Sequence, residues 1–346
     1  MSGGGHNGAE PRHPRDTTAL FGHHEAEAAL LDSYRGGRMP HAFLIGGPRG
    51  VGKATLAYRM ARFVLAHDDP ALPAVRAATS LAVDPDHPAA RRVAQDTHGG
   101  LLVLERRPDD KGNMRASIVV NQVRETVPFF GSTATSGWRV CIVDCVDELQ
   151  SPAAPNALLK ILEEPPPRAL FLLVSHAPGR VLATIQSRCR KLMLRALDDG
   201  DVIRAAAASL DMPGDSPDLI AAARAGEGSV ARAITFLGVD SRALHGRITA
   251  LLDALPAVDP LAMHALGEAL GGSDRAPLML FADTVDQWLA RRLGVPDANA
   301  RLARLAQVAE VWEKVSRAIR DAETWNLERK PLVFSVFGLL ADVARP

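Results

Sequence analysis

A run of residues near the N-terminus has the types and spacing of a phosphate-binding loop. Gly46-Gly47-Pro48-Arg49-Gly50-Val51-Gly52-Lys53 is followed by Ala54, and Gly47 to Lys53 satisfy the pattern GxxxxGK. The glycines, Gly47, Gly50 and Gly52, let backbone N–H groups turn toward an anion, while Lys53 would reach the β- and γ-phosphates of a nucleotide. The other interpretation is a glycine turn with a surface lysine.

The position after Lys53 lacks the hydroxyl that completes this pattern. A serine or threonine there normally ligates Mg²⁺, which prefers oxygen ligands in octahedral geometry. Ala54 cannot do this, and Thr55 lies about 100° further round the helix. We therefore expect no competent ATP hydrolysis and no metal, whereas weak nucleotide binding to a degenerate loop stays open.

A second altered position follows an apolar run. Asp144 comes directly after Val140-Cys141-Ile142-Val143, where an ATPase of this kind holds Mg²⁺ through water, but Cys145 stands where the hydrolytic glutamate is usual. Asp147 and Glu148 are displaced by two and three positions. Asp144 is then either an eroded magnesium site or a cap of the next helix.

These residues need a sheet to position them. Apolar runs predict buried strands at residues 41–45, 138–144 and 170–175, and helical periodicity predicts helices at 19–34, 54–65, 121–127 and 156–164. Residues 67–116 look irregular. Strands that alternate with helices indicate a parallel α/β sheet, and strand, glycine loop and helix is the context that a phosphate loop requires.

After about Leu197 the strand signals stop. Ala-rich segments run to Leu237, with Gly226 and Gly228 between them, and one apolar stripe steps by three or four residues. Its members are Leu302, Leu305, Val308, Trp312, Val315 and Ile319.

Composition narrows the function classes. Formal net charge is zero, with 40 basic and 40 acidic residues, which argues against a protein that coats nucleic acid on its own. Three cysteines, Cys141, Cys145 and Cys189, fit a reducing cytosol. No apolar run reaches the roughly 18 residues of a membrane span, and Met1–Asp16 reads as a disordered leader without a signal peptide. A cytoplasmic location is expected.

Two further motifs carry a family resemblance. Residues 156–166 (NALLKILEEPP) and 184–189 (TIQSRC), together with His41 to Lys53, resemble the bacterial clamp-loader branch of the AAA+ family. The resemblance covers about residues 20–240. The C-terminal third matches only in being helical and in Trp325-Asn326-Leu327.

The resemblance implies a domain plan and a set of partners. The plan is a leader (1–16), an α/β AAA+ P-loop domain with a parallel sheet (17–196), a small helical lid domain (197–240) and an all-α C-terminal collar domain for oligomerisation (241–346). The implied assembly is a five-subunit ring that loads a sliding clamp on primed DNA. Its other members are gamma/tau-type motor subunits and a delta subunit, and no membrane is involved.

Within such a ring, Arg188 of the Ser-Arg-Cys motif would act in trans, as an arginine finger on the γ-phosphate of the adjacent motor subunit. The other interpretation of Arg188 is a solvated helix-end arginine. Cys189 is predicted to be a small apolar side chain that is buried. Lys160 is either a DNA-backbone contact or a solvated lysine, and Ser175 is either a γ-phosphate sensor or a strand-end polar group.

The chain departs from the family's motor subunits at further positions. They carry a sensor arginine directly after a Gly-Ser-apolar turn, but Ala231 follows Gly228-Ser229-Val230 and Arg232 comes one place late. Residues 67–116 lack the four cysteines of a zinc module. Asp84, Asp86, His87 and His98 have no metal-ligand spacing.

Together with these departures, the resemblance implies a non-hydrolysing stator of the bacterial DNA polymerase III clamp loader in DNA replication. Such a subunit would belong to the DNA polymerase holoenzyme without independent ATPase activity. The alternative is an ATP-hydrolysing gamma/tau-type motor subunit.

Overall fold

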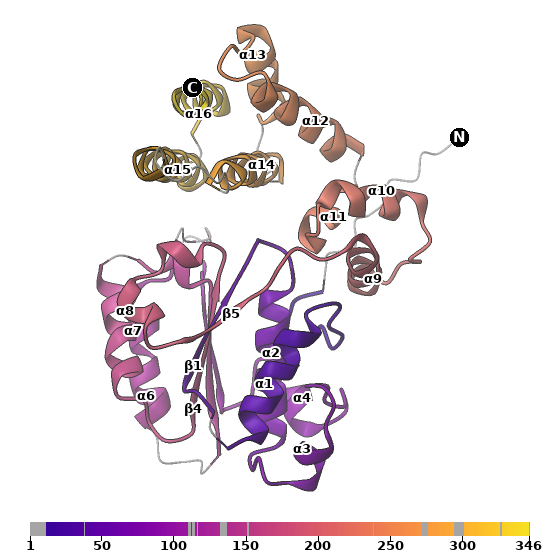
Figure 1. Cartoon of the computed structure of the whole chain (residues 1–346), viewed down its shortest axis with the longest axis vertical. Coiled ribbons are helices and arrows are strands. Elements are labelled where there is room, and N and C mark those ends of the chain that lie inside the picture. Colours follow the sequence, from indigo (N-terminus) through magenta and orange to yellow (C-terminus); the bar gives the residue numbers. More distant parts are fainter. Residues whose placement is uncertain are drawn as a thin grey trace. The chain divides into compact units, whose positions relative to one another are not determined.

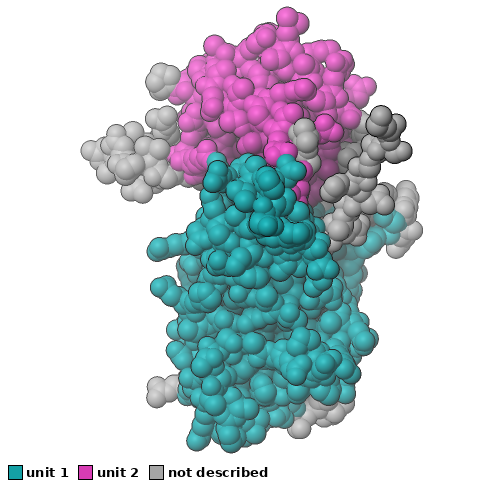
Figure 2. Space-filling view, turned by 90° about the vertical axis from the view of Figure 1, so that its right-hand side faces the viewer, with its two compact units in different colours: residues 1–234 teal, residues 235–346 magenta. Residues whose placement is uncertain are grey.

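A computed structural model describes residues 12–37, 39–109, 112, 115, 117–131, 137–150, 152–237, 239–271, 276–293, 301–325 and 327–345. The chain divides into two compact units, Met1–Ile234 and Thr235–Pro346 (Figure 2). The second unit begins inside α11, so the predicted border between lid and collar at residue 240 stays a prediction.

The first unit is built on a five-stranded sheet in the order β2-β3-β4-β1-β5. All four strand pairs are parallel, so the carboxyl ends of the strands meet at one edge. The strands are β1 (Ala42–Gly46), β2 (Leu101–Glu105), β3 (Arg139–Asp144), β4 (Ala169–Ser175) and β5 (Arg190–Met193). The predicted α/β class with a parallel sheet is confirmed.

Successive strand residues point to opposite faces, and each face has its own apolar core. Phe43, Ile45 and Ile142 face one side. In Figure 1 this side is covered by α1 (His24–Arg35), α2 (Lys53–Ala66), α3 (Pro73–Ala77) and α4 (Pro88–Ala94).

The opposite core holds Leu44 and Phe171, and α6, α7 and α8 cover that side in Figure 1. The elements that follow β2 in the chain up to β5 are α5 (Val120–Arg124), α6 (Thr126–Gly131), the 3₁₀ turns η1 (Val146–Glu148) and η2 (Pro178–Arg180), α7 (Ala153–Glu163) and α8 (Ala183–Gln186). Parallel strands buried on both faces explain why the sequence showed continuous apolar runs.

Three local predictions were wrong. Residues 67–116 are not irregular, because they contain α3, α4 and the edge strand β2. The first helix begins at His24 and not at Ala19, since Gly22 and His23 are left-handed with φ of 65° and 56°. The helix predicted at 121–127 is two short helices, and Pro128 lies in the first turn of α6, where its missing N–H costs no hydrogen bond.

The predicted leader lies outside the described residues up to Pro11. Its last residues are ordered, in contrast to the prediction. Arg62 of α2 donates to the carbonyl oxygens of Pro14 and Thr17 at 3.3 and 2.6 Å, and Arg15 pairs with Asp96 at 3.0 Å.

In the described part of the chain after β5, the regular elements are helices. The first unit ends with α9 (Asp199–Leu210), α10 (Pro217–Gly226) and most of α11 (Val230–Phe236). The second unit contains α12 (Val239–Asp253), α13 (Pro260–Ala269), α14 (Ala276–Leu293), α15 (Arg301–Thr324) and α16 (Arg329–Ala344). Val308, Val315 and Ile319 of the predicted stripe are buried. Among the described residues, no helix is both long and apolar enough to span a membrane.

Candidate functional site: a degenerate phosphate loop and a paired arginine

The glycine loop joins β1 to α2, as the strand–loop–helix pattern predicts. Gly47, Gly50 and Gly52 have φ of 143°, 76° and 100°, a region that side chains rarely adopt. Space is restricted as well. A methyl group at Gly47 would lie 2.4 Å from the Leu194 carbonyl oxygen. Backbone conformation therefore favours glycine at all three positions, and packing requires it at Gly47 and Gly50 as well, whether or not an anion binds.

Lys53 does not extend toward a ligand position in this structure. Its ammonium donates to the carbonyl oxygens of Gly47 at 2.8 Å and of Pro48, and the residue is 3% exposed. Burial lowers its pKa to about 8 from the usual 10.5, although Cys145, Asp144 and Asp147 act in the opposite direction. The lysine of the phosphate-loop pattern is thus bonded to backbone oxygens of its own loop.

We expect Lys53→Met to remove a pH dependence of the folding stability. Below pH 8 the folded chain carries a buried charge that the unfolded chain carries in water, which costs about 3 kcal/mol. Because the folded pKa lies below the unfolded one, this cost disappears as pH rises from 8 to 10.5. Urea unfolding should therefore show that the free energy of unfolding of the unchanged protein rises relative to that of Lys53→Met across this pH range. Relative to Lys160→Met, at an exposed position of α7, no such rise is expected, and an equal response of the two variants would contradict the expectation.

The turn before α11 lies on the phosphate loop. Val230 N donates to Gly50 O at 2.9 Å, and a methyl group at Gly50 would lie 2.3 Å from Ser229 Oγ and 2.7 Å from Ala231 Cβ. Ala231 thus lies next to the phosphate loop. Arg232, one position later, has its guanidinium 3.6 Å from Glu227.

Asp144 ends β3 at the same edge of the sheet as the phosphate loop. Burial raises its pKa to about 6, and Glu148 and Glu105 add to the rise, while Lys53 opposes it. The N-cap position of the next helix, η1, belongs to Cys145. The structure therefore does not support the interpretation of Asp144 as a helix cap. Asp144 is half-buried and lies close enough to the buried Lys53 for the two charges to influence each other's pKa.

The two displaced acids are both bonded within the chain. Asp147 accepts hydrogen bonds from Ser175 Oγ at 2.7 Å, Cys145 Sγ at 2.8 Å and Ala177 N at 3.2 Å. Glu148 lies 2.9 Å from Arg106 and 3.6 Å from Arg49. Ser175, the candidate γ-phosphate sensor, is fully buried and bonded to Asp147. Asp147 therefore joins the carboxyl ends of β3 and β4.

Arg188 lies beyond α8 and is paired with the last residue of α7. Nη2 donates to Glu163 Oε1 at 2.7 Å, and Nη1 donates to Thr184 O at 2.8 Å. The Arg188 side chain is 34% exposed. Cys189 next to it is half-buried in the core under α7, and burial raises its thiol pKa to about 11, which makes it a weak nucleophile at neutral pH.

The residues considered for a metal site have other roles. Asp84 accepts from Asp86 N at 2.8 Å, His87 accepts from Ala89 N at the start of α4, and Asp86 pairs with Arg91. Lys160 and Trp325 are exposed, and Asn326 lies outside the described residues.

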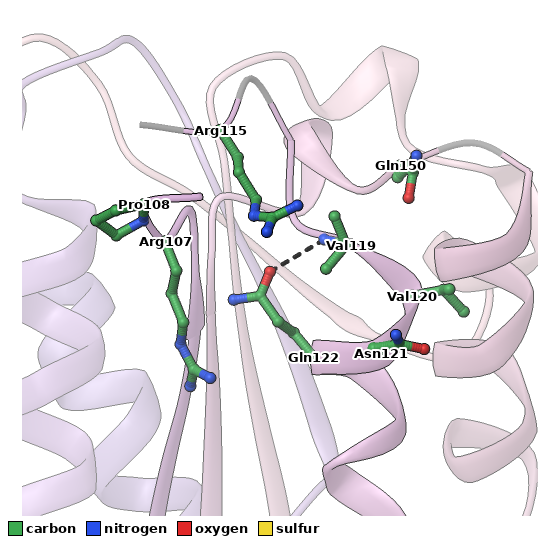
Figure 3. A pocket seen from close by; sticks show the side chains of 8 residues that line it. All are labelled: Arg107, Pro108, Arg115, Val119, Val120, Asn121, Gln122 and Gln150. Carbon is green, nitrogen blue, oxygen red and sulfur yellow. Dashed lines mark hydrogen bonds between the residues drawn. The ribbon is translucent and has the colours of Figure 1, made fainter. Parts of the chain in front are cut away.

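A cavity of about 510 Å³ lies between β2 and α5 (Figure 3) and was not predicted from the sequence. Gln122 forms one wall, because its side chain accepts from Val119 N at 3.1 Å and donates to Glu105 O at 2.9 Å. Arg107 is paired with Glu125 at 3.1 Å. The lining is Arg107, Pro108, Arg115, Val119, Val120, Asn121, Gln122 and Gln150. Its scattered polar residues form no sequence motif, which is why spacing could not find it.

The chain is similar in sequence to subunits of DNA polymerase III. A family model described as "DNA polymerase III, delta subunit" matches residues 22–198. The DNA polymerase III subunit delta' of Escherichia coli (strain K12) is 30% identical over 290 residues, which cover 82% of this chain and 76% of that one. The subunit delta' of Pseudomonas aeruginosa is 38% identical over 161 residues, which cover 46% and 45%.

Other relatives belong to a different subunit type. The DNA polymerase III subunit gamma/tau of Mycobacterium tuberculosis (strain H37Rv) is 29% identical over 318 residues, which cover 83% of this chain and 51% of that one. The chain spans about half the length of several curated relatives that it matches. A solved gamma subunit-related protein from Thermotoga maritima aligns with a TM-score of 0.45 and 14% identity over 91% of this chain and 99% of that one.

Proposed function

This chain belongs to the DNA polymerase III delta-subunit family, and on that premise we propose that it is the delta-prime subunit of a bacterial clamp loader. In this role it is a non-hydrolysing stator. It donates a trans arginine finger, Arg188, to the adjacent ATPase subunit while a sliding clamp is loaded during DNA replication.

One observation carries the non-hydrolysing part of the proposal. Ala54 follows Lys53 where Mg²⁺ needs a hydroxyl, and Lys53 itself donates to the carbonyl oxygens of its own loop. The hydrogen bond from Val230 N to Gly50 O also attaches the turn before α11 to the loop. A nucleotide would have to displace these contacts, so we propose that the site serves as a scaffold with at most weak nucleotide affinity.

The exposed end of the Ser-Arg-Cys motif supports the finger. A guanidinium is always charged and can contact two phosphate oxygens at once, which suits it to stabilise the charge that develops on a transferring phosphoryl group. Arg188 is partly exposed, and its described hydrogen bonds go to α7 and α8 and not to the phosphate loop of its own chain. Such a group is available to a nucleotide held by a neighbour.

The proposed partners are gamma/tau motor subunits, a delta subunit, the sliding clamp and primed DNA. The gamma/tau and delta' relatives support an assembly of related subunits. Arg115 at the cavity offers a cationic group for a contact with a DNA phosphate, whereas Arg107 there is paired with Glu125. Lys160, exposed on α7, is a further candidate for such a contact.

We expect the purified chain to hydrolyse no ATP above background, and we expect Ala54→Ser to leave this unchanged. The added hydroxyl restores one magnesium ligand, but Cys145 and Ala231 still stand where a motor needs a glutamate and an arginine. Phosphate release at saturating Mg-ATP measures this directly, with a gamma/tau subunit as the positive control. Turnover comparable to that of the motor subunit would favour the alternative assignment as a motor.

Reconstitution tests the proposal as a whole. Motor and delta subunits are mixed with and without this chain, and clamp loading on primed DNA is followed. The proposal requires loading to depend on the chain. Full loading in its absence would contradict the stator role.

A further inference from the structure

Both ends of the Arg188 guanidinium are anchored within the chain. Nη2 donates to Glu163 Oε1 at 2.7 Å, and Nη1 donates to Thr184 O at 2.8 Å, with Ser187 Oγ further away at 3.5 Å. A guanidinium carries five N–H donors, so two anchors leave others for a further acceptor. The side chain is therefore oriented before any partner arrives.

The backbone that carries the two anchors, Glu163 and Thr184, is held by packing. Glu163 is the last residue of α7, Leu162 before it is 1% exposed, and Pro165-Pro166-Pro167 follow. On the other side, Ile185 of α8 is 1% exposed, and Gln186 donates to Pro178 O at 3.0 Å and Val181 O at 2.8 Å. Packing of the neighbouring residues therefore holds the backbone of Glu163 and of Thr184 in place.

The pair contributes little to stability by itself. The two side chains are 34% and 50% exposed, and ion pairs at such positions are weakened by solvent and salt. The Glu163 carboxylate instead restricts the conformations of the long, flexible Arg188 side chain. For a residue that must meet a neighbour's phosphate, a fixed orientation reduces the entropy lost on contact.

We infer that Glu163 is a positioning residue, which holds the Arg188 guanidinium in the orientation that reaches the nucleotide of the adjacent subunit. The inference rests on the proposed function, because it needs Arg188 to act in trans. It concerns a carboxylate of the Leu-Glu-Glu-Pro-Pro segment that is 25 residues away from the arginine in sequence.

The test uses the complete loader with clamp and primed DNA, in single-turnover ATP hydrolysis. Arg188→Ala first defines the hydrolysis phase that depends on this arginine. Glu163→Ala should slow that phase about tenfold, as loss of an orienting partner does, with the ATP concentration for half-maximal rate unchanged. Glu163→Gln keeps an acceptor oxygen and should recover most of the rate. Glu164→Ala, the exposed neighbour, is the matched control and should leave the phase intact.

The outcomes separate the two proposals. If Arg188→Ala leaves stimulated hydrolysis unchanged, the finger itself is wrong. If Arg188→Ala removes the phase but Glu163→Ala does not slow it, or accelerates it by releasing the arginine, only the positioning role is overturned. In the Arg188→Ala background, Glu163→Ala should have no further effect. A further loss there would show that Glu163 acts through the fold and not through Arg188.

Discussion

Replacing Arg188 with alanine is expected to reduce ATP hydrolysis at the one adjacent motor site by about 10³-fold or more, the usual contribution of an arginine finger. The reason is electrostatic, since the transferring phosphoryl group gains a charge that a guanidinium stabilises and a methyl group does not. The rate of stimulated phosphate release by the reconstituted loader should fall by the part that this motor site contributes. Clamp loading on primed DNA should slow as well.

Two controls make the result specific. Arg180→Ala removes another exposed arginine from the nearby η2 turn and should change nothing. Arg188→Lys keeps the positive charge but loses the planar fork that contacts two oxygens, so it should recover only a small part of the rate. Unchanged hydrolysis in the Arg188→Ala complex would remove the finger from the proposal, while the scaffold role of the phosphate loop would remain.

The second large effect is expected at a buried ion pair that joins α1 to α2. Glu27 and Arg59 are 7% and 6% exposed, and Glu27 Oε1 accepts from Arg59 Nε at 3.0 Å and Nη2 at 2.6 Å. The same oxygen accepts from Leu81 N at 3.1 Å. One carboxylate thus ties two helices to the segment between α3 and α4.

Glu27→Ala should lower the free energy of unfolding by about 3–5 kcal/mol, because it leaves a buried guanidinium without its counter-charge. Urea unfolding followed by circular dichroism measures the loss. Hydrogen exchange should also become faster at the Leu81 amide, which loses its acceptor. Glu25→Ala, an exposed acid in the same first turn of α1, should cost no more than about 1 kcal/mol. Equal losses for the two variants would show that the pair does not support the fold.

The structure decides between several local predictions for a common physical reason. Edge strands show only a weak hydrophobic pattern in the sequence, since their formation depends on backbone hydrogen bonds to a neighbouring strand. β5, with Arg190, Lys191 and Met193 exposed, pairs with β1 in parallel and was not predicted. β2 was also missed, although the apolar run Leu101–Leu104 was a signal for it. The buried strands β1, β3 and β4 were predictable because both of their faces are covered.

The sequence by itself determined the phosphate-loop pattern and the side chains that depart from it. Strand, glycine loop and helix are a local pattern, and the absence of a hydroxyl, a carboxylate and a guanidinium at Ala54, Cys145 and Ala231 can be read from the residue types alone. Only the tertiary structure decided where the remaining polar groups are bonded. Lys53 turns to carbonyl oxygens, Asp147 meets Ser175 across 28 residues, and Glu163 meets Arg188 across 25. Backbone acceptors carry no residue-specific signal, and pairs distant in sequence meet only when the sheet brings its strand ends and helix ends together.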